Sequence, residues 1–141
     1  MSDQRPGQLT AEPAICLEQV SKVFGKRGQK PFVAVDRLGL TVAQGQMLAL
    51  LGKTGCGKST IFNMIAGLTE PTSGRVLVEG RNPFAEFEAF RGRIAIVFQN
   101  DRLLPWRTAI QNVELGLEML GVRRDTRRAT AQRWVDTLGL R

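Results

Sequence analysis

The feature that most constrains this 141-residue sequence is a glycine-rich loop between an apolar run and a helical pattern. Residues 47–62 read MLALLGKTGCGKSTIF, and residues 52–59 within them fit the pattern G-x-x-x-x-G-K-[ST]. A continuous apolar run is typical of a strand covered on both faces of a parallel sheet. The sequence therefore predicts a buried strand at residues 47–51, a tight loop, and a helix at residues 58–66.

The composition of this loop indicates a site for phosphate groups. Gly52, Gly55 and Gly57 allow backbone turns that side chains forbid, so successive N–H groups can point inward as an anion nest. The first N–H groups of the following helix lack internal partners, and the helix dipole adds positive potential there. Lys58 supplies a full charge for the β- and γ-phosphates, and the Ser59 hydroxyl is a hard oxygen suited to Mg²⁺.

The other residues of the loop have less specific roles. We expect Thr60 to hydrogen-bond a phosphate, and Lys53 and Thr54 to serve the phosphates through their backbone while their side chains point outward. Cys56 is interpreted as a small filler inside the nest, with a redox role as the alternative. The loop thus predicts binding of a nucleoside triphosphate with Mg²⁺, but it does not define a reaction.

The surrounding patterns predict an α/β fold. Alternation and β-branched residues predict a small antiparallel sheet from residues 14–20 and from residues 32–42, which form one or two strands. A basic turn at residues 21–31 joins them, and a second apolar run at residues 94–98 predicts another buried strand. Strand–loop–helix units that repeat in this way are typical of α/β proteins. The remaining elements are predicted as a strand and turn at 75–80 and helices at 83–90, 109–120 and 125–138.

Helical spacing of apolar residues predicts which helix faces pack inward, and Thr108 is a candidate N-cap. The predicted inward positions are Ile61, Ile65 and Leu68 in the first helix, Ile110, Val113, Leu117 and Leu120 in the third, and Ala131, Trp134, Val135 and Leu138 in the last.

Composition argues against several functional classes. The net charge is +7, but the densest basic run, RRDTRR at residues 123–128, contains an acid and no aromatic residue, so nucleic acid is not an expected partner. Cys16 and Cys56 form no metal-ligand pattern, and there is no histidine, which argues against structural zinc. The apolar runs are far shorter than the ~18 residues of a membrane span. Residues 1–13 are polar and are predicted to be a disordered lead.

A second informative stretch, IAIVFQNDRLLPWRT, begins at Ile94 and places Gln99 directly after the predicted second strand. In α/β sheets, ligands bind beyond the carboxyl ends of the strands. Gln99 can therefore offer its amide oxygen to a Mg²⁺ held at Ser59 or position a water near the γ-phosphate, although a solvated loop glutamine fits the pattern equally well.

With its phosphate loop and this stretch, the sequence resembles the ATP-binding subunit of an ABC transporter over residues 15–140. The resemblance is strongest to importers of the nitrate, sulfonate, taurine and bicarbonate group, through the Leu-Leu-Pro-Trp that ends at Trp106. It implies a P-loop NTPase fold: a parallel core sheet, an N-terminal antiparallel β-subdomain and the start of a helical subdomain, so that residues 14–141 form a truncated ATP-binding domain.

The resemblance also implies roles for individual residues. Residues 52–60 would be the phosphate loop, with KTG in place of the commoner PSG. Gln99 would touch Mg²⁺ and sense the γ-phosphate. Phe24 would stack on adenine where the family usually has tyrosine, although from the residues alone it fits a core position equally well. Residues 100–107 would face the coupling helix of the permease.

Further partners and the location of the protein follow from the same resemblance. The intact protein would form a homodimer with a second ATP-binding subunit, and the full system would include a periplasmic solute-binding protein. The subunit would be peripheral, at the cytoplasmic face of the inner membrane.

The family's later motifs do not occur in this sequence. ABC ATPases need an LSGGQ-like signature, a strand ending in Asp-Glu and a later histidine, and none is present here. No acidic residue after Gln99 follows a run of four apolar residues: Asp101, Glu114, Glu118, Asp125 and Asp136. We therefore interpret the chain as the N-terminal part of a longer protein, with weak Mg-ATP binding, negligible hydrolysis and open strand edges on its own.

Two alternatives compete with this interpretation. The first is a non-catalytic nucleotide-binding module or inactive fragment that pairs with an intact subunit. The second is another P-loop protein, but a GTPase needs an Asn-Lys-x-Asp tetrad, which is absent, and a small kinase should show acceptor-binding and lid segments.

Overall fold

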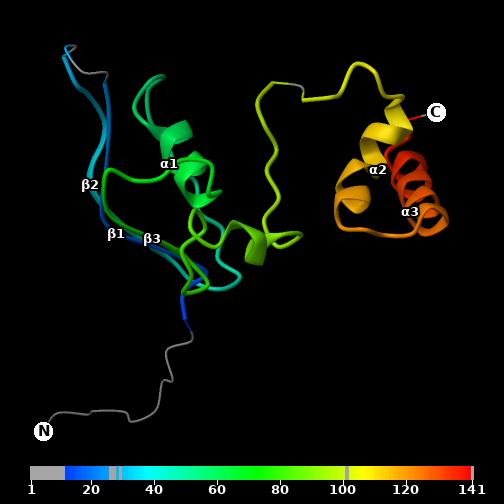
Figure 1. Ribbon diagram of the computed structural model, residues 1–141, viewed down its shortest axis with the longest axis horizontal. Coiled ribbons are helices and arrows are strands. Elements are labelled where there is room, and N and C mark those ends of the chain that lie inside the picture. Colours follow the sequence, from blue (N-terminus) through cyan, green and yellow to red (C-terminus); the bar gives the residue numbers. More distant parts are fainter. Residues whose placement is uncertain (1–11, 26–27, 29, 101, 141) are drawn as a thin grey trace, which may run out of the picture. The chain divides into compact units, whose positions relative to one another are not determined.

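A computed structural model of the chain describes residues 12–25, 28, 30–100 and 102–140. The chain divides into two units, Met1–Phe90 and Arg91–Arg141. The first unit contains a sheet and the helix that follows the glycine-rich loop, and the second contains a helical hairpin (Figure 1). Most of the predicted disordered lead lies outside the described residues.

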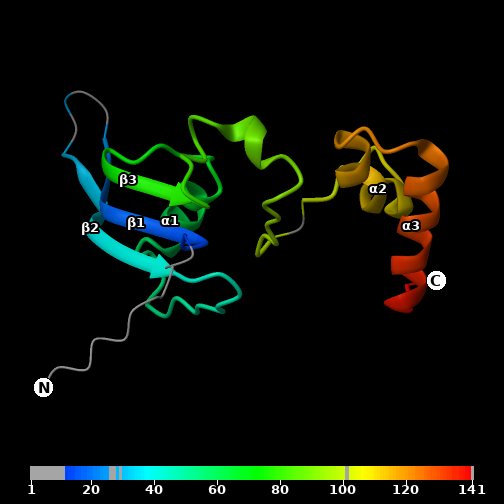
Figure 2. The same ribbon diagram turned by 90° about the horizontal axis from the view of Figure 1, so that it is seen from below.

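The first unit is built on a three-stranded antiparallel sheet of order β2-β1-β3. β1 (Ile15–Phe24) is the central strand, between β2 (Phe32–Val42) and β3 (Ser73–Val78) (Figure 2). Ile15 pairs with Val42 of β2 and also with the last residue of β3. The predicted antiparallel sheet is confirmed, and residues 32–42 form one strand.

β1 is longer than predicted, because it continues through Phe24 into the segment predicted as a basic turn. Ser21 is buried at this point. Its hydroxyl accepts a hydrogen bond from the Arg37 amide at 2.9 Å, and its carbonyl accepts one from the Thr72 amide at 2.8 Å. The strand therefore continues because the polar groups of a buried serine find partners on both sides, a signal that hydrophobic alternation does not contain.

The core of the first unit lies between the sheet and α1 (Lys58–Ile65). Met64 is almost fully buried against strand residues, and Ile61 and Ile65 pack beside it. These contacts confirm the predicted inward positions except Leu68, which is exposed. Burial of a methionine side chain contributes about 1.5–3 kcal/mol, so α1 is held to the sheet mainly by this face. The apolar residues of the cluster are Leu17, Val20, Val35, Met64 and Val76.

After β3 the chain turns through residues 79–86 into a short 3₁₀ helix, η1 (Phe87–Phe90), where a helix was predicted from residue 83. Pro83 and Phe90 are buried and fix the two ends of this segment.

The two continuous apolar runs do not form the predicted parallel strands. Neither residues 47–51 nor residues 94–98 are assigned to a strand, and their side chains are largely exposed: 95% for Met47, 92% for Leu51 and 98% for Val97. A strand needs neighbours that accept its hydrogen bonds and a layer that covers its faces. None of the described segments pairs with either run, so the hydrophobic pattern alone cannot make them strands.

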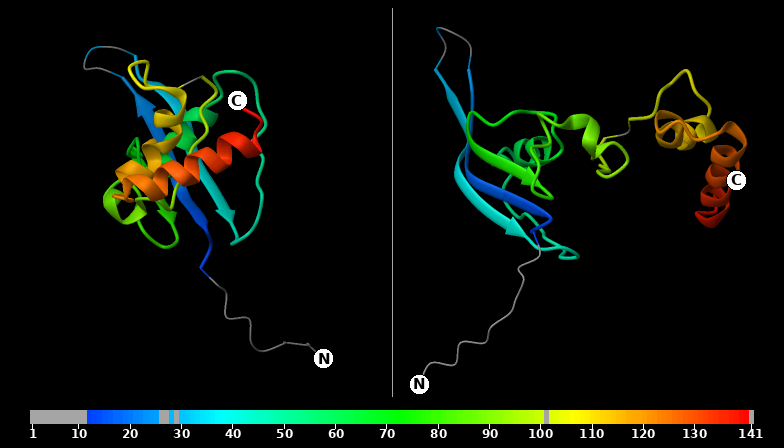
Figure 3. Two further views of the ribbon diagram at one scale, coloured as in Figure 1. Left: turned by 90° about the vertical axis from the view of Figure 1, so that its right-hand side faces the viewer. Right: turned by 60° about the horizontal axis from the view of Figure 1, so that its bottom comes forward.

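The second unit is a hairpin of two helices, α2 (Ala109–Met119) and α3 (Arg124–Thr137) (Figure 3). Thr108 caps α2 as predicted: its hydroxyl accepts from the Gln111 amide, while the Gln111 side chain accepts from the Thr108 amide. Gly121, with φ of 73°, follows the end of α2 and allows the chain to turn into α3.

Half of the predicted inward positions in the hairpin are wrong. Ala131 is buried, and Ile110, Leu117 and Val135 are half-buried. The exposed ones are Val113, Leu120, Trp134 and Leu138. The reason is that the α2–α3 interface is polar: the buried residue of α2 is Glu114, not an apolar one. Within the described residues, no helix is long and apolar enough to cross a membrane.

Candidate functional site: a phosphate loop

The candidate site is the loop of residues 52–60, which lies between the exposed apolar run and α1. Gly55 and Gly57 have φ of 81° and 93°, so both occupy the left-handed region that favours glycine. The Cys56 amide donates to the Lys53 carbonyl at 3.3 Å and closes a turn. Of the three glycines that the sequence singled out, Gly55 and Gly57 are therefore required by the backbone, whereas Gly52 does not have a positive φ.

Gly57 also connects the loop to the sheet. A Cβ at this position would lie 2.4 Å from the Ala34 carbonyl oxygen of β2, so the helix can begin this close to the strand only with glycine. Gly57 is the N-cap of α1, and no side chain caps the helix. The first N–H groups of α1 therefore lack helical acceptors, which is the property that an anion site uses.

Lys58, the first residue of α1, folds its side chain back over the loop. Its Nζ donates to the Gly52 carbonyl at 2.6 Å and to the Lys53 carbonyl at 2.8 Å, and it lies 3.3 Å from Cys56 Sγ. The loop carbonyls thus hold the ammonium group beside the N-terminus of the helix. A phosphate at this position would meet a full positive charge together with the helix dipole.

Cys56 is packed against Gly52 within the loop. A Cβ added to Gly52 would lie 2.6 Å from the Cys56 sulfur, so the two residues can approach only because one of them is glycine. The role of Cys56 inside the nest stays a prediction. The thiol is exposed and not disulfide-bonded.

The chemistry of the loop fits a Mg²⁺ ion shared with phosphate oxygens. Ser59 lies in the first turn of α1 with an exposed side chain, and its hydroxyl is a suitable hard ligand. In the part of the chain that the structure describes, no group of three acidic, histidine or cysteine side chains can hold a metal by itself. Mg²⁺ is usually bound through one or two protein ligands together with phosphate oxygens.

Phe24 lies at the end of β1 and is 45% exposed, so it is not a core residue, and its role in stacking on adenine stays a prediction. Lys22 Nζ lies over its ring, 5.2 Å from the centroid. Gln99 belongs to the second unit, in an exposed bend. Its position relative to the phosphate loop stays a prediction. Asp101 lies outside the described residues.

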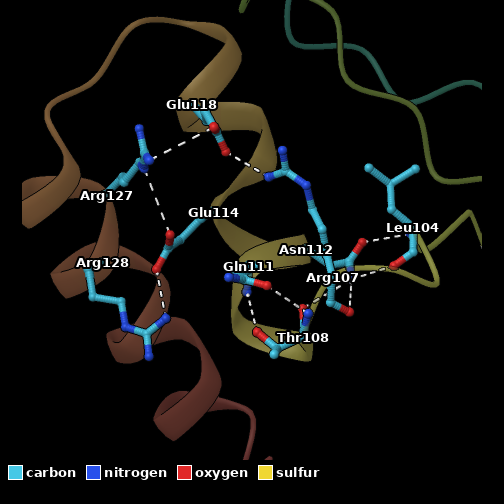
Figure 4. A network of polar contacts seen from close by, with 9 residues as sticks. All are labelled: Leu104, Arg107, Thr108, Gln111, Asn112, Glu114, Glu118, Arg127 and Arg128. Atoms are coloured by element: carbon cyan, nitrogen blue, oxygen red, sulfur yellow. Dashed lines mark hydrogen bonds and ion pairs between the residues drawn. The ribbon is translucent and has the colours of Figure 1, made fainter.

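The second unit holds a polar network that sequence analysis missed (Figure 4). Arg107 binds Glu118 at 2.7 Å, and Arg128 binds the buried Glu114 at 3.0 Å. Arg127 lies between the two carboxylates, 3.7 Å from Glu114 and 3.9 Å from Glu118. The acids sit four residues apart on α2, so one face of the helix carries both. This spacing was the sequence signal from which the polar network could have been predicted.

The hydrogen bond from Arg107 lowers the pKa of the Glu118 carboxyl below its ordinary value. Partial burial opposes this shift, and the positive charges of Arg107 and Arg127 add to it. Glu118 therefore stays ionised in the folded hairpin at pH values where a free glutamate is partly protonated.

Asn112 anchors the loop that precedes α2. Its side-chain oxygen accepts from the Leu104 amide at 2.8 Å, and its amide group donates to the carbonyls of Leu104 and Arg107, both at 3.2 Å, and of Thr108 at 3.0 Å. One side chain thus fixes the backbone on both sides of Trp106, which is 76% exposed.

The sequence of residues 35–141 matches the ABC transporter family. The chain belongs to this family. It is 44% identical over 118 residues to the taurine import ATP-binding protein TauB of Burkholderia pseudomallei, covering 84% of this chain and 44% of the relative. It is 38% identical over 140 residues to the Fe(3+) ions import ATP-binding protein FbpC of Brucella suis, covering 99% of this chain and 36% of that protein.

The fold comparison agrees with the assignment to the ABC family. The ATP-binding cassette MJ0796, in a dimeric post-hydrolysis state bound to ADP and Pi, superposes with a TM-score of 0.78 and 30% identity, over 90% of this chain and 58% of that one. The predicted family and the predicted P-loop NTPase fold class are therefore confirmed, and the taurine importers among the relatives fall in the predicted importer group. The chain spans less than half of the length of these curated ABC relatives.

Proposed function

We propose that this chain supplies the nucleotide-binding N-terminal part of the ATP-binding subunit of an ABC importer, which couples ATP binding and hydrolysis to solute uptake. The observation that carries the proposal is the phosphate loop itself: two left-handed glycines, an uncapped helix N-terminus and the Lys58 ammonium converge on residues 52–60. The similarity to taurine import proteins supports a small sulfonate or a related oxyanion, such as nitrate, as the solute.

The loop would bind the nucleotide through its backbone. Amides from Lys53 to Thr60 would surround the β- and γ-phosphates, and Lys58 would exchange its two carbonyl contacts for phosphate oxygens. The carbonyl oxygens are neutral, whereas phosphate oxygens carry negative charge, so the exchange adds attraction between opposite charges and favours the bound state. Phe24 would stack on adenine.

Mg²⁺, when bound, would neutralise charge on the β- and γ-phosphates. Ser59 would hold it through its hydroxyl and Gln99 through its side-chain oxygen. Gln99 would also report the presence of the γ-phosphate.

The partners and location follow from the same proposal. The permease would dock on residues 100–107, where the exposed indole of Trp106 is presented by a backbone fixed through Asn112. A second ATP-binding subunit would complete a homodimer, and a periplasmic solute-binding protein would deliver the solute. The subunit would be peripheral, at the cytoplasmic face of the inner membrane.

Hydrolysis requires groups that the 141 residues do not provide. Positioning and electrostatics catalyse phosphoryl transfer, and a residue must orient the attacking water. Among the acidic residues after Gln99, none follows a run of four apolar residues in the sequence, so we propose that this chain alone binds Mg-ATP weakly and has negligible turnover. The alternative function, a non-catalytic nucleotide-binding module, is favoured by the same observation.

Isothermal titration calorimetry with Mg-ATP tests the proposal. We expect saturable binding by the wild-type chain and a loss of at least about tenfold for Lys58→Ala, because a charge-assisted contact contributes about 1.5–3 kcal/mol. Lys30 is an exposed lysine of the β1–β2 connection. Lys30→Ala removes the same charge and should leave the affinity nearly unchanged. Equal affinity of wild type and Lys58→Ala would contradict the proposal.

A transport assay separates the enzyme from the non-catalytic module. A separately expressed C-terminal segment of a taurine import relative should restore ATP-dependent uptake together with this chain if the chain is part of a working ATPase. Binding of ATP without restored turnover would support the module.

A further inference from the structure

The end of β1 places a lysine against the ring proposed to stack on the nucleobase. Lys22 and Phe24 lie in the last three residues of β1, where the pairing with β2 shifts register, and the lysine side chain reaches the ring. Lys22 Nζ lies over the ring, 5.2 Å from its centroid, and also donates to the Glu70 carbonyl at 2.7 Å. The ammonium group is thus held between a carbonyl and one face of the phenyl ring.

The backbone beneath this pair is fixed by the chain that follows α1. The Thr72 amide donates to the Ser21 carbonyl at 2.8 Å, and the Val23 amide donates to the Thr72 hydroxyl at 3.0 Å. The Thr72 hydroxyl also lies 3.5 Å from the Val23 carbonyl, to which it donates. With the contact from Lys22 to Glu70, four hydrogen bonds join the end of β1 to residues 70–72. The strand end is therefore set in place independently of any ligand.

We propose that Lys22 is a positioning residue for the base of the bound nucleotide. Its ammonium group occupies one face of the Phe24 ring, so the base stacks on the opposite face. This inference rests on the proposed nucleotide-binding function and adds a residue to that site. A phenyl ring has no hydroxyl that could fix its orientation by a hydrogen bond. A cation over the ring supplies that orientation instead, and an ordered ring loses less entropy when a base stacks on it.

The inference makes a distinction that a general effect of charge does not. A positioning residue for the base strengthens the binding of ATP but not of inorganic tripolyphosphate, which has the phosphates without the base. A lysine that acts only through its charge strengthens both, because it attracts the phosphates.

The test is calorimetric titration of the 141-residue chain with Mg-ATP and with Mg-tripolyphosphate. Lys22→Met keeps the length of the side chain and removes the cation, and we expect ATP binding to weaken about two- to fivefold, as for an exposed cation–π contact, with tripolyphosphate unchanged. Lys30→Met is the matched control and should not change the affinity for ATP relative to the affinity for tripolyphosphate. Lys22→Arg keeps a cation over the ring and should retain wild-type affinity.

A double-mutant cycle protects the test against a general loss of folding. Phe24→Ala should lower the affinity for ATP about tenfold, because the base loses its stacking contact. In that background Lys22→Met should have no further effect on ATP, because there is no ring left to position. A misfolded variant would instead lose tripolyphosphate binding as well.

Three results would overturn the inference. Equal losses of ATP and tripolyphosphate binding in a Lys22→Met variant whose amide NMR spectrum shows it to be folded would show that the lysine acts through charge. An unchanged ATP affinity would show that it does not position the ring. Wild-type affinity for ATP no greater than for tripolyphosphate would leave the phosphate loop standing but show that Phe24 contacts no base. The proposed function fails separately, if the wild-type chain binds neither ligand.

Discussion

The two units of this chain are stabilised by different kinds of interface. In the first, α1 packs against the sheet through Met64 and aliphatic neighbours, and the phosphate loop ends at the start of this helix. In the second, α2 and α3 meet through Glu114, Arg127 and Arg128. Apolar burial depends little on pH and salt, whereas ion pairs depend on both. The phosphate loop therefore has the more constant support, and the hairpin is the part that changing conditions can loosen.

The largest expected effect is on the apolar interface. Met64→Ala removes the most buried side chain of α1, and we expect the first unit to lose about 2–5 kcal/mol in its free energy of unfolding. Amide hydrogen exchange of β1 and α1 measures this, because both tryptophans, Trp106 and Trp134, lie in the second unit and their fluorescence reports on that unit.

The control for this substitution is Leu68→Ala, whose side chain is exposed, and which should change stability by much less. If the amides of β1 and α1 exchanged at the same rates in the two variants, the apolar contacts of α1 would not be what supports the loop.

A smaller effect is expected where the loop meets the sheet. Gly57→Ala places a Cβ against the Ala34 carbonyl at a positive φ, and such strain costs about 1–3 kcal/mol. We expect Gly57→Ala to lower both the stability of the first unit and its affinity for Mg-ATP, because relief of the clash would displace the loop together with the start of α1. Gly39→Ala, where a Cβ meets nothing within 4 Å and φ is not positive, is the matched control for calorimetry and should bind as wild type does.

In the second unit, Asn112→Ala removes four hydrogen bonds to the backbone around Trp106. We expect a loss of about 1–3 kcal/mol for the hairpin, because the loop amides and carbonyls lose their partner. The tryptophan fluorescence of a Trp134→Phe background, which leaves Trp106 as the reporter, measures the unfolding. Gln132→Ala removes one exposed contact, to Asp136, and should have little effect.

The smallest effect is a dependence on pH that only the hairpin should show. The pKa of Glu118 is lowered in the folded state, so its contribution to stability is fully present above the unfolded pKa of about 4.3 and is lost as pH falls through the lower folded value. Glu118→Gln should remove this part of the acid dependence of tryptophan fluorescence. Glu70→Gln, an exposed acid of the first unit, should not. An unaltered acid transition in Glu118→Gln would contradict the account of the ion pairs.

Local sequence signals predicted the phosphate loop well. The glycines, Lys58 and the helix start are specified within a few residues, and the structure has the left-handed glycines and the uncapped helix that the pattern required. The same holds for the Thr108 cap. In these cases the residues that decide the geometry are neighbours in the sequence.

Features that depend on distant partners were predicted poorly. The apolar runs at residues 47–51 and 94–98 fit buried strands, but a strand also needs neighbours to pair with, and none of the described segments supplies them. Helical spacing placed Trp134 inward, whereas the charges of Glu114 and Arg128 determine the interface instead. The extension of β1 to Phe24 depends on Thr72, nearly fifty residues later in the chain.

The most direct test of the central claim is a titration of the ¹⁵N-labelled chain with Mg-ATP followed by NMR. The account predicts saturable shifts of the amides of Gly55, Gly57, Lys58, Ser59 and Thr60, which Lys58→Ala abolishes while the spectrum of the sheet is retained. Saturable shifts that leave these amides unchanged, or no shifts in a sample whose sheet resonances show it to be folded, would contradict it.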